Sequence, residues 1–169
     1  MNIVLTGFMG SGKSSVGKQL ADVLGFGFID TDQMIEQDVG MPITKIFQFK
    51  GEPYFRKIEA RAIALVSMLD RHVIATGGGV PMNENNMHEL EKNSVIVHLQ
   101  VTPETVLKRI GHDHKRPLLK TKDPLATARE ILRKRQRAYE RCSLAVPTDN
   151  HNVDAIVQTI VKFFREHDS

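Results

Sequence analysis

The residues Gly7-Phe8-Met9-Gly10-Ser11-Gly12-Lys13-Ser14 fit the G-x-x-x-x-G-K-[S/T] pattern of a phosphate-binding loop. Glycines in this pattern let backbone N–H groups point at the phosphates of a nucleotide, and the following helix adds its dipole. The lysine reaches the β- and γ-phosphates, and the serine hydroxyl is a ligand of Mg²⁺. An ordinary glycine-rich turn would not require a lysine followed by a serine. The pattern therefore predicts a nucleoside triphosphate site that includes Lys13 and Ser14.

Two carboxylates, Asp30 and Asp32, follow a short apolar run. Residues two apart on a strand project to the same side, so both side chains are expected to face the nucleotide site. Asp30 is expected to hold the hydration shell of Mg²⁺, and Asp32 to accept the proton of an attacking hydroxyl group. The alternative is a turn in which Asp32 caps the next helix. The neighbouring phosphate-binding loop favours the first interpretation.

Two arginines and a run of three glycines indicate a site for a substrate carboxylate. Arg135 lies on the apolar stripe of an expected helix, and a buried guanidinium needs an anion to offset its desolvation. Arg56 and Glu59 are three residues apart on another helix, so the carboxylate can hold the guanidinium in place. The backbone of Gly77-Gly78-Gly79 is expected to complete this clamp. The alternative for Arg56 is an ordinary ion pair on the helix surface.

Short apolar runs alternate with amphipathic stretches along the whole chain. Five runs are expected as strands, at residues 3–5, 26–29, 72–75, 95–101 and 144–146. The stretches between them have apolar residues at helical spacing. One helix is expected to bury a stripe of five residues: Phe55, Ile58, Ala62, Leu65 and Leu69. Buried strands that alternate with helices are typical of the α/β class. We expect three α/β/α layers around a five-stranded parallel sheet, with the ligand at the carboxyl ends of the strands.

The segment 111–124 is polar and basic, without periodicity and with little apolar surface to bury. Connections of this length in compact domains are often lids. Arg116 is expected to close on the γ-phosphate, and Arg109, just before the segment, to stack on adenine. His112 and His114 have no partners at metal-ligand spacing and are expected to be exposed.

Composition and charge narrow the class of protein. A length of 169 residues predicts one domain, 1–169. Residues 108–141 carry 12 basic and 4 acidic side chains. They include one aromatic residue, which favours an anionic small molecule over nucleic acid. No apolar run reaches the ~18–20 residues of a membrane helix. The absence of a signal-peptide pattern and the single cysteine, Cys142, lead us to expect a cytoplasmic protein. We also expect a monomer that does not bind membranes.

These motifs together resemble the shikimate kinase family. Besides the phosphate-binding loop, the resemblance rests on five motifs, in order and at compatible spacing: Phe28-Ile29-Asp30-Thr31-Asp32, Phe55-Arg56-Lys57-Ile58-Glu59, Thr76-Gly77-Gly78-Gly79, Arg116-Pro117-Leu118-Leu119 and Arg135-x-x-x-Tyr139. It covers nearly the whole chain. The loop alone would indicate only a nucleotide-binding superfamily, whereas the other motifs are much more specific.

The resemblance implies a P-loop kinase fold, with substrate-binding helices at about 33–60 and a lid at about 111–124. It also implies phosphorylation of the 3-hydroxyl of shikimate by ATP with Mg²⁺ as cofactor, on the route to chorismate and the aromatic amino acids. The catalytic residues would be Lys13, Asp32 and Arg116. The ATP-binding residues would be Gly10, Ser11, Gly12, Lys13, Ser14, Ser15, Arg109 and Arg116. The shikimate-binding residues would be Asp32, Arg56, Glu59, Gly77, Gly78, Gly79 and Arg135. The Mg²⁺-binding residues would be Ser14 and Asp30.

Two other functions fit parts of the pattern. Another small-metabolite kinase, such as a gluconate kinase, would share the nucleotide site and differ in the acceptor. A nucleotide-binding regulator without catalysis would share the fold, but the intact residues of the phosphoryl path argue against it. These are Lys13, Ser14, Asp30, Asp32 and Arg116.

Overall fold

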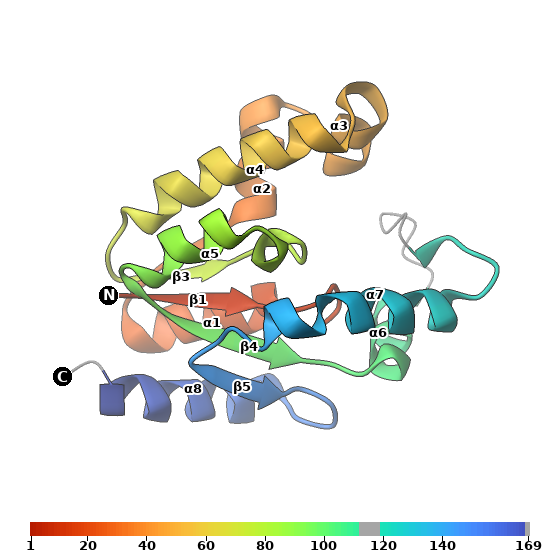
Figure 1. Cartoon of the computed structure of the whole chain (residues 1–169). Coiled ribbons are helices and arrows are strands. Elements are labelled where there is room, and N and C mark those ends of the chain that lie inside the picture. The colour runs from red at the N-terminus through yellow and green to blue at the C-terminus, as the bar shows by residue number, and fades with distance from the viewer. Residues whose placement is uncertain (112–118, 168–169) are drawn as a thin grey trace.

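The computed structural model describes residues 1–111 and 119–167. At its centre lies a five-stranded sheet with the order β2-β3-β1-β4-β5 (Figure 1). All neighbouring strands pair in parallel. The strands are β1 (Asn2–Thr6), β2 (Gly27–Asp30), β3 (His72–Ala75), β4 (Ser94–Gln100) and β5 (Leu144–Pro147). The α/β fold class predicted from the sequence is confirmed.

The helices alternate with these strands along the chain. They are α1 (Lys13–Leu24), α2 (Thr31–Val39), α3 (Ile43–Lys50), α4 (Glu52–Ser67), α5 (Glu84–Glu91), α6 (Pro103–Ile110), α7 (Pro124–Tyr139) and α8 (Val153–His167), with the short 3-10 helix η1 (Val80–Met82). Several ends follow from local sequence. For example, Thr102 caps α6 by accepting the N–H of Thr105, and Pro103 occupies the first turn.

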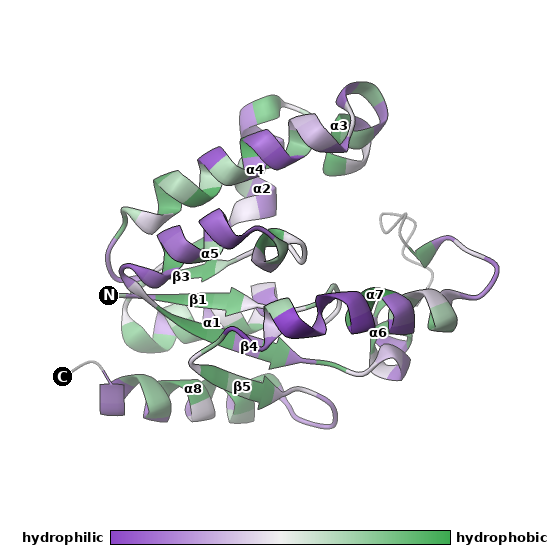
Figure 2. Cartoon of the chain, in the orientation of Figure 1, coloured by the Kyte–Doolittle hydropathy of each residue, from purple (hydrophilic) through white to green (hydrophobic). Residues whose placement is uncertain are grey.

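Helices cover both faces of the sheet. Ile3 and Leu5 of β1 pack with residues of α1 and α8, whereas Val4 between them packs with residues of α4 and α5. Alternate residues of a strand face opposite sides, so the continuous apolar run is buried on both faces. Figure 1 shows α1 and α8 below the sheet and α5 above it. In Figure 2 the strands are mostly hydrophobic, and the helices carry hydrophilic residues as well.

Two groups of helices flank the carboxyl ends of the strands. Helices α2, α3 and α4 pack together through Ile35, Ile46 and Phe55. Helices α6 and α7 pack through Val106 and Ala128, together with residues of the phosphate-binding loop. These groups lie on either side of the edge at which the ligand is expected.

The predicted apolar stripe of α4 is confirmed except at one position: Phe55 and Ala62 are buried, and Ile58 and Leu69 are partly buried. Leu65 of the predicted apolar stripe is 53% exposed. A second row is also buried, towards the sheet: Glu59, Ile63 and Val66. Phe55 of the predicted stripe faces α2 and α3. A stripe defined by apolar residues alone does not include this second row, because the row begins with a carboxylate.

Part of the predicted lid, including Arg116, His112 and His114, lies outside the described residues. At its described end, Leu119 is buried against residues of α6 and α7. The expectation that the segment has little apolar surface to bury is therefore wrong at this end. Among the helices of the described residues, none has the length and apolar character needed to cross a membrane.

Candidate active site

The phosphate-binding loop joins β1 to α1, and its glycines adopt conformations that other residues rarely do. Gly10 and Gly12 have φ angles of 74° and 92°. Gly12 precedes α1, whose first turn has no side-chain cap. Ser11 Oγ is buried and has no hydrogen-bond partner within the described part of the chain. An uncapped helix start beside a buried polar atom suits the oxygens of a phosphate group.

Lys13 and Ser14 occupy the positions that the motif predicts. Lys13 Nζ donates to the carbonyl oxygens of Gly7 and Phe8, at 2.7 and 3.1 Å, and so lies across the loop. Ser14 Oγ donates to Asp30 Oδ2 at 2.7 Å. A hydroxyl and a carboxylate at this position fit Mg²⁺, which binds oxygen and takes only one or two carboxylates from a protein. The described residues contain no cluster of His, Cys, Asp and Glu that could form an all-protein metal site.

Asp30 ends β2 and also caps α2. Its Oδ1 accepts the N–H groups of Asp32 and Gln33, at 3.0 and 3.2 Å, and α2 begins at Thr31. The prediction that both aspartates lie on one strand is therefore wrong, and so is the alternative that Asp32 is the cap. Asp30 uses one carboxylate oxygen for the cap and the other for Ser14. Asp32 approaches the site from the first turn of a helix.

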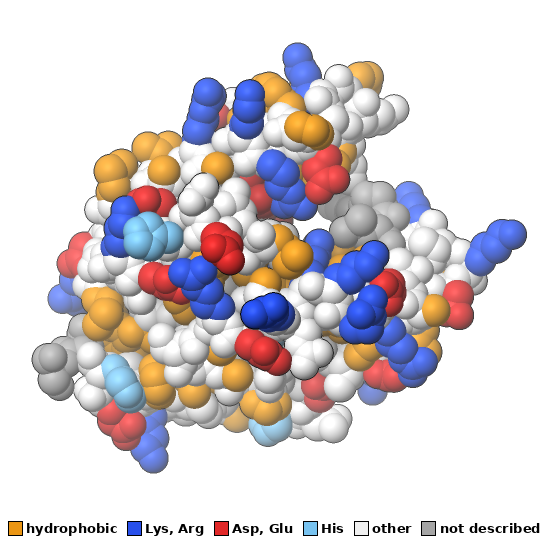
Figure 3. Space-filling view, in the orientation of Figure 1, with side chains coloured by type: hydrophobic (Ala, Val, Ile, Leu, Met, Phe, Trp, Pro, Cys, Tyr) orange, Lys and Arg blue, Asp and Glu red, His pale blue; other side chains and the backbone are white. Residues whose placement is uncertain are grey.

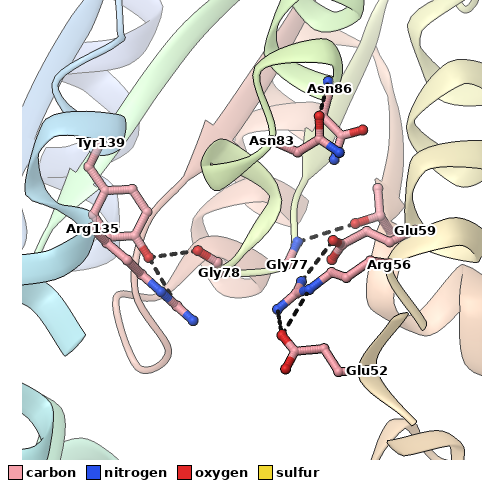
Figure 4. Close-up of polar contacts among 10 residues, drawn as sticks. Glu52, Arg56, Glu59, Gly77, Gly78, Asn83, Asn86, Arg135 and Tyr139 are labelled. Carbon is pink, nitrogen blue, oxygen red and sulfur yellow. Dashed lines mark hydrogen bonds and ion pairs between the residues drawn. The ribbon is translucent and has the colours of Figure 1, made fainter. Parts of the chain in front are cut away.

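The predicted substrate-binding side chains meet at Gly77-Gly78-Gly79, which follows β3. A Cβ atom added to Gly77 would lie 2.7 Å from Asp32 Oδ1. One added to Gly78 would lie 3.1 Å from Arg135 Nη1, and one added to Gly79 would lie 2.6 Å from Arg56 Nη1. Side chains in the glycine positions would therefore displace these groups. Figure 4 shows Arg135 and Arg56 on opposite sides of this turn. The glycines allow α2, α4 and α7 to bring three functional groups to one point.

Thr31 supports the glycine turn and was not predicted as a site residue. It is fully buried, and its Oγ1 accepts the N–H of Gly77 at 3.2 Å. Its place between the two aspartates of the Asp-Thr-Asp motif was the only available signal.

Arg56 is held by two carboxylates of its own helix. Its Nη1 donates to Glu59 Oε1 at 2.8 Å, and its Nε and Nη2 donate to Glu52 Oε1 at 3.4 and 3.3 Å. Burial raises the pKa of the Glu59 carboxyl, although Arg56 opposes this. Burial alone would lower the pKa of Arg56, but the two carboxylates outweigh it and the pKa is raised. The alternative for Arg56, an ion pair on the helix surface, therefore describes its contact with the exposed Glu52. It does not describe the contact with Glu59, because Glu59 is buried.

Arg135 is half-buried on the inner side of α7, close to its predicted position. Its guanidinium carbon lies 5.7 Å from the centre of the Phe8 ring, and its Nη1 donates to Tyr139 Oη at 3.4 Å. Three other arginines of α7 are exposed, as predicted: Arg129, Arg133 and Arg137.

A cavity of about 460 Å³ lies between α4, η1 and α7. Its charged lining residues are Glu52, Arg56, Glu59, Lys134 and Arg135. Figure 3 shows a hollow on this face with basic and acidic side chains near it. Both glutamates contact Arg56, so the surplus of positive charge lies on the α7 side. The cavity is therefore suited to a small molecule with a carboxylate.

Arg109 lies beside the phosphate-binding loop and connects it to the end of β5. Its Nη1 donates to Gly10 O and to Thr148 Oγ1, both at 3.0 Å, and its Nη2 donates to Thr148 O at 2.8 Å. These bonds use the edge of the guanidinium and leave its planar faces for stacking. The contact of Arg109 with adenine stays a prediction.

His98 of β4 lies under the site and was not predicted to belong to it. Its ring stacks on Tyr139 with the ring centres 4.7 Å apart, and its Nδ1 lies 3.4 Å from Thr6 Oγ1. Burial lowers the pKa of His98 to about 4, and the charge of Lys13 acts in the same direction. The ring is therefore neutral at pH 7.

We expect His98 to make the protein sensitive to acid. Its pKa is about 4 in the folded chain and 6.5 ordinarily, so the unfolded chain binds the proton more readily. The contribution of neutral His98 to the free energy of unfolding is fully present above pH 6.5 and is lost as the pH falls towards 4. Between about pH 7 and pH 5, the free energy of unfolding should fall by about 1–2 kcal/mol less in His98→Gln than in the wild type. The Tm of the variant should therefore fall by about 2–8 °C less. Thermal unfolding at both pH values tests this, with the exposed His88→Gln as control. An equal fall of Tm in wild type and His98→Gln would contradict it.

Comparisons with known proteins agree with this geometry. The sequence pattern of the shikimate kinase family (SKI) matches residues 9–165. A shikimate kinase of Caldanaerobacter subterraneus is 42% identical over 163 residues, which are 96% of this chain and 95% of that protein. The structure of Acinetobacter baumannii shikimate kinase in complex with shikimate superposes with a TM-score of 0.94 at 32% identity, covering 98% of this chain and 93% of that one. A gluconokinase from Sinorhizobium meliloti has a TM-score of 0.55 at 20% identity over 93% and 87% of the two chains, a likeness of fold alone.

Proposed function

The chain belongs to the shikimate kinase family, and we propose that it transfers the γ-phosphoryl group of ATP to the 3-hydroxyl of shikimate, in aromatic biosynthesis. The observation that carries this proposal is the meeting of Asp32, Arg56 and Arg135 at the three glycines. This turn follows β3, the neighbour of β1, which leads into the phosphate-binding loop. If the arginines bind the carboxylate of shikimate, the hydroxyl groups of its ring would point from the cavity towards the nucleotide.

Each side chain has a role in this reaction. Arg135 and Arg56 bind the substrate carboxylate, and Glu59 holds Arg56 in place. Asp32 accepts the proton of the attacking hydroxyl. Lys13 and the backbone of residues 10–15 bind the phosphates and stabilise the charge that develops on them.

Ser14 and Asp30 would hold Mg²⁺, Ser14 through its hydroxyl and Asp30 through the ion's water shell. The short contact between them and the phosphate-binding loop beside them support this assignment. When bound, the ion neutralises charge on the β- and γ-phosphates.

Arg116 would contribute a positive charge at the γ-phosphate as residues 111–124 close over the site. It lies outside the described residues, so this role stays a prediction. The monomeric state, the single domain and the cytoplasmic location also stay predictions.

A coupled assay of ADP release tests the function, with shikimate, with gluconate and without an acceptor. We expect rapid release with shikimate only, because the chain is 42% identical to a shikimate kinase and resembles the gluconokinase in fold alone. Release with gluconate instead would establish the other small-metabolite kinase. ATP binding without turnover of either acid would indicate the regulator.

Gly79→Ala should weaken shikimate binding selectively. Gly79 has φ −90° and ψ −8°, which alanine adopts without strain. The new methyl group would nevertheless lie 2.6 Å from Arg56 Nη1, so the guanidinium must move. We expect the KM for shikimate to rise about tenfold, equivalent to ~1.4 kcal/mol, and the KM for ATP to stay nearly unchanged. Steady-state kinetics with each substrate varied in turn measures both values. An unchanged KM for shikimate would show that Arg56 does not bind it.

A further inference from the structure

We propose that Tyr139 is a positioning residue for substrate binding, whose hydroxyl group fixes Arg135 and the backbone of Gly78 relative to each other. The inference rests on the proposed function, in which Arg135 and the glycine turn bind shikimate. It adds a residue that touches neither the nucleotide nor the acceptor in that scheme.

The hydroxyl of Tyr139 links Arg135, which lines the cavity, to the glycine turn, in which Gly79 lines the cavity. It donates to Gly78 O at 2.7 Å and accepts from Arg135 Nη1 at 3.4 Å (Figure 4). Arg135 belongs to α7 and Gly78 follows β3, so the two groups come from distant parts of the chain. The carbonyl uses the one hydroxyl proton and the guanidinium uses an oxygen lone pair, so both contacts form at once.

The ring that carries this hydroxyl is itself held firmly. Tyr139 is 3% exposed, and its ring stacks on His98 with the planes 21° apart. His98 Nδ1 in turn lies 3.4 Å from Oγ1 of Thr6, the last residue of β1. The central strands therefore fix the ring, and the ring fixes the hydroxyl. A guanidinium on a long flexible side chain gains most from such a fixed partner, because less rotamer freedom remains to be lost on binding.

Tyr139→Phe tests the proposal, because it removes the oxygen and keeps the ring on His98. We expect the KM for shikimate to rise about five- to tenfold, as for the loss of one ordinary hydrogen bond, because the contact with Arg135 is long, at 3.4 Å. The KM for ATP and kcat should each change by less than about twofold, because Tyr139 acts only on acceptor binding.

Two further variants separate positioning from stability. Ile160→Val removes a methylene from the buried core under α8, far from the cavity, and lowers stability without touching the site. It should leave both KM values unchanged. Arg135→Lys removes the guanidinium on which Tyr139 acts. Tyr139→Phe should therefore raise the KM less in the Arg135→Lys chain than in the wild-type chain.

Several results would overturn the proposal. One is an unchanged KM for shikimate in Tyr139→Phe, and another is an equal rise of both KM values. A double variant whose effect equals the product of the single effects would show that Tyr139 acts independently of Arg135. A Tyr139→Phe chain that fails to fold would assign the hydroxyl to stability instead. Failure of the wild-type chain to phosphorylate shikimate would overturn the proposed function as well, which distinguishes the two.

Discussion

Asp32→Asn should reduce turnover of shikimate by about a hundred- to ten-thousandfold, the range for loss of a general base. Asparagine has nearly the same size and shape as aspartate, but its amide cannot take up the proton of the attacking hydroxyl. Asp32 Oδ1 lies against Gly77, where the acceptor is expected, and the side chain is only partly buried. The variant should therefore fold normally and bind both substrates with little change.

Steady-state kcat and circular dichroism check this expectation together. Asp38→Asn is the matched control, because Asp38 is exposed and lies on the same helix α2. It should retain wild-type turnover. Near-wild-type kcat in a folded Asp32→Asn chain would exclude Asp32 as the base and leave it a role in orienting the acceptor.

The sequence alone was sufficient for the elements whose signals are local. The phosphate-binding loop, the helix from Lys13 to Leu24 and the five apolar strands depend on residues close together in the chain. The inward position of Arg135 was also predictable, because one apolar stripe dominates α7. In α4, by contrast, two rows of side chains are buried. The row that was not predicted contains Glu59, and a carboxylate is found in a core only when a partner such as Arg56 accompanies it.

The remaining features depend on contacts between distant segments. Asp30 can cap a helix or continue a strand, and its contact with Ser14, 16 residues away, accompanies the cap. The role of the three glycines depends on helices α2, α4 and α7 converging on one turn. His98 is one of two polar residues, with Gln100, in an expected strand that is otherwise apolar. Its stacking on Tyr139 depends on how α7 packs beside the sheet.

Arg135→Lys should raise the KM for shikimate about ten- to a hundredfold, equivalent to ~1.5–3 kcal/mol for hydrogen bonds to a charged group. A guanidinium can donate two parallel hydrogen bonds to a carboxylate, whereas an ammonium is a point charge without that fork. The lysine also loses the planar group that lies over the Phe8 ring and meets Tyr139 Oη. The KM for ATP should change by less than about twofold, because the substitution weakens binding of the acceptor and leaves the nucleotide site intact. Arg137→Lys, an exposed position on the same helix, should change neither value. If Arg135→Lys raised both KM values equally, Arg135 would support the architecture of the site, and the carboxylate would depend on Arg56 alone.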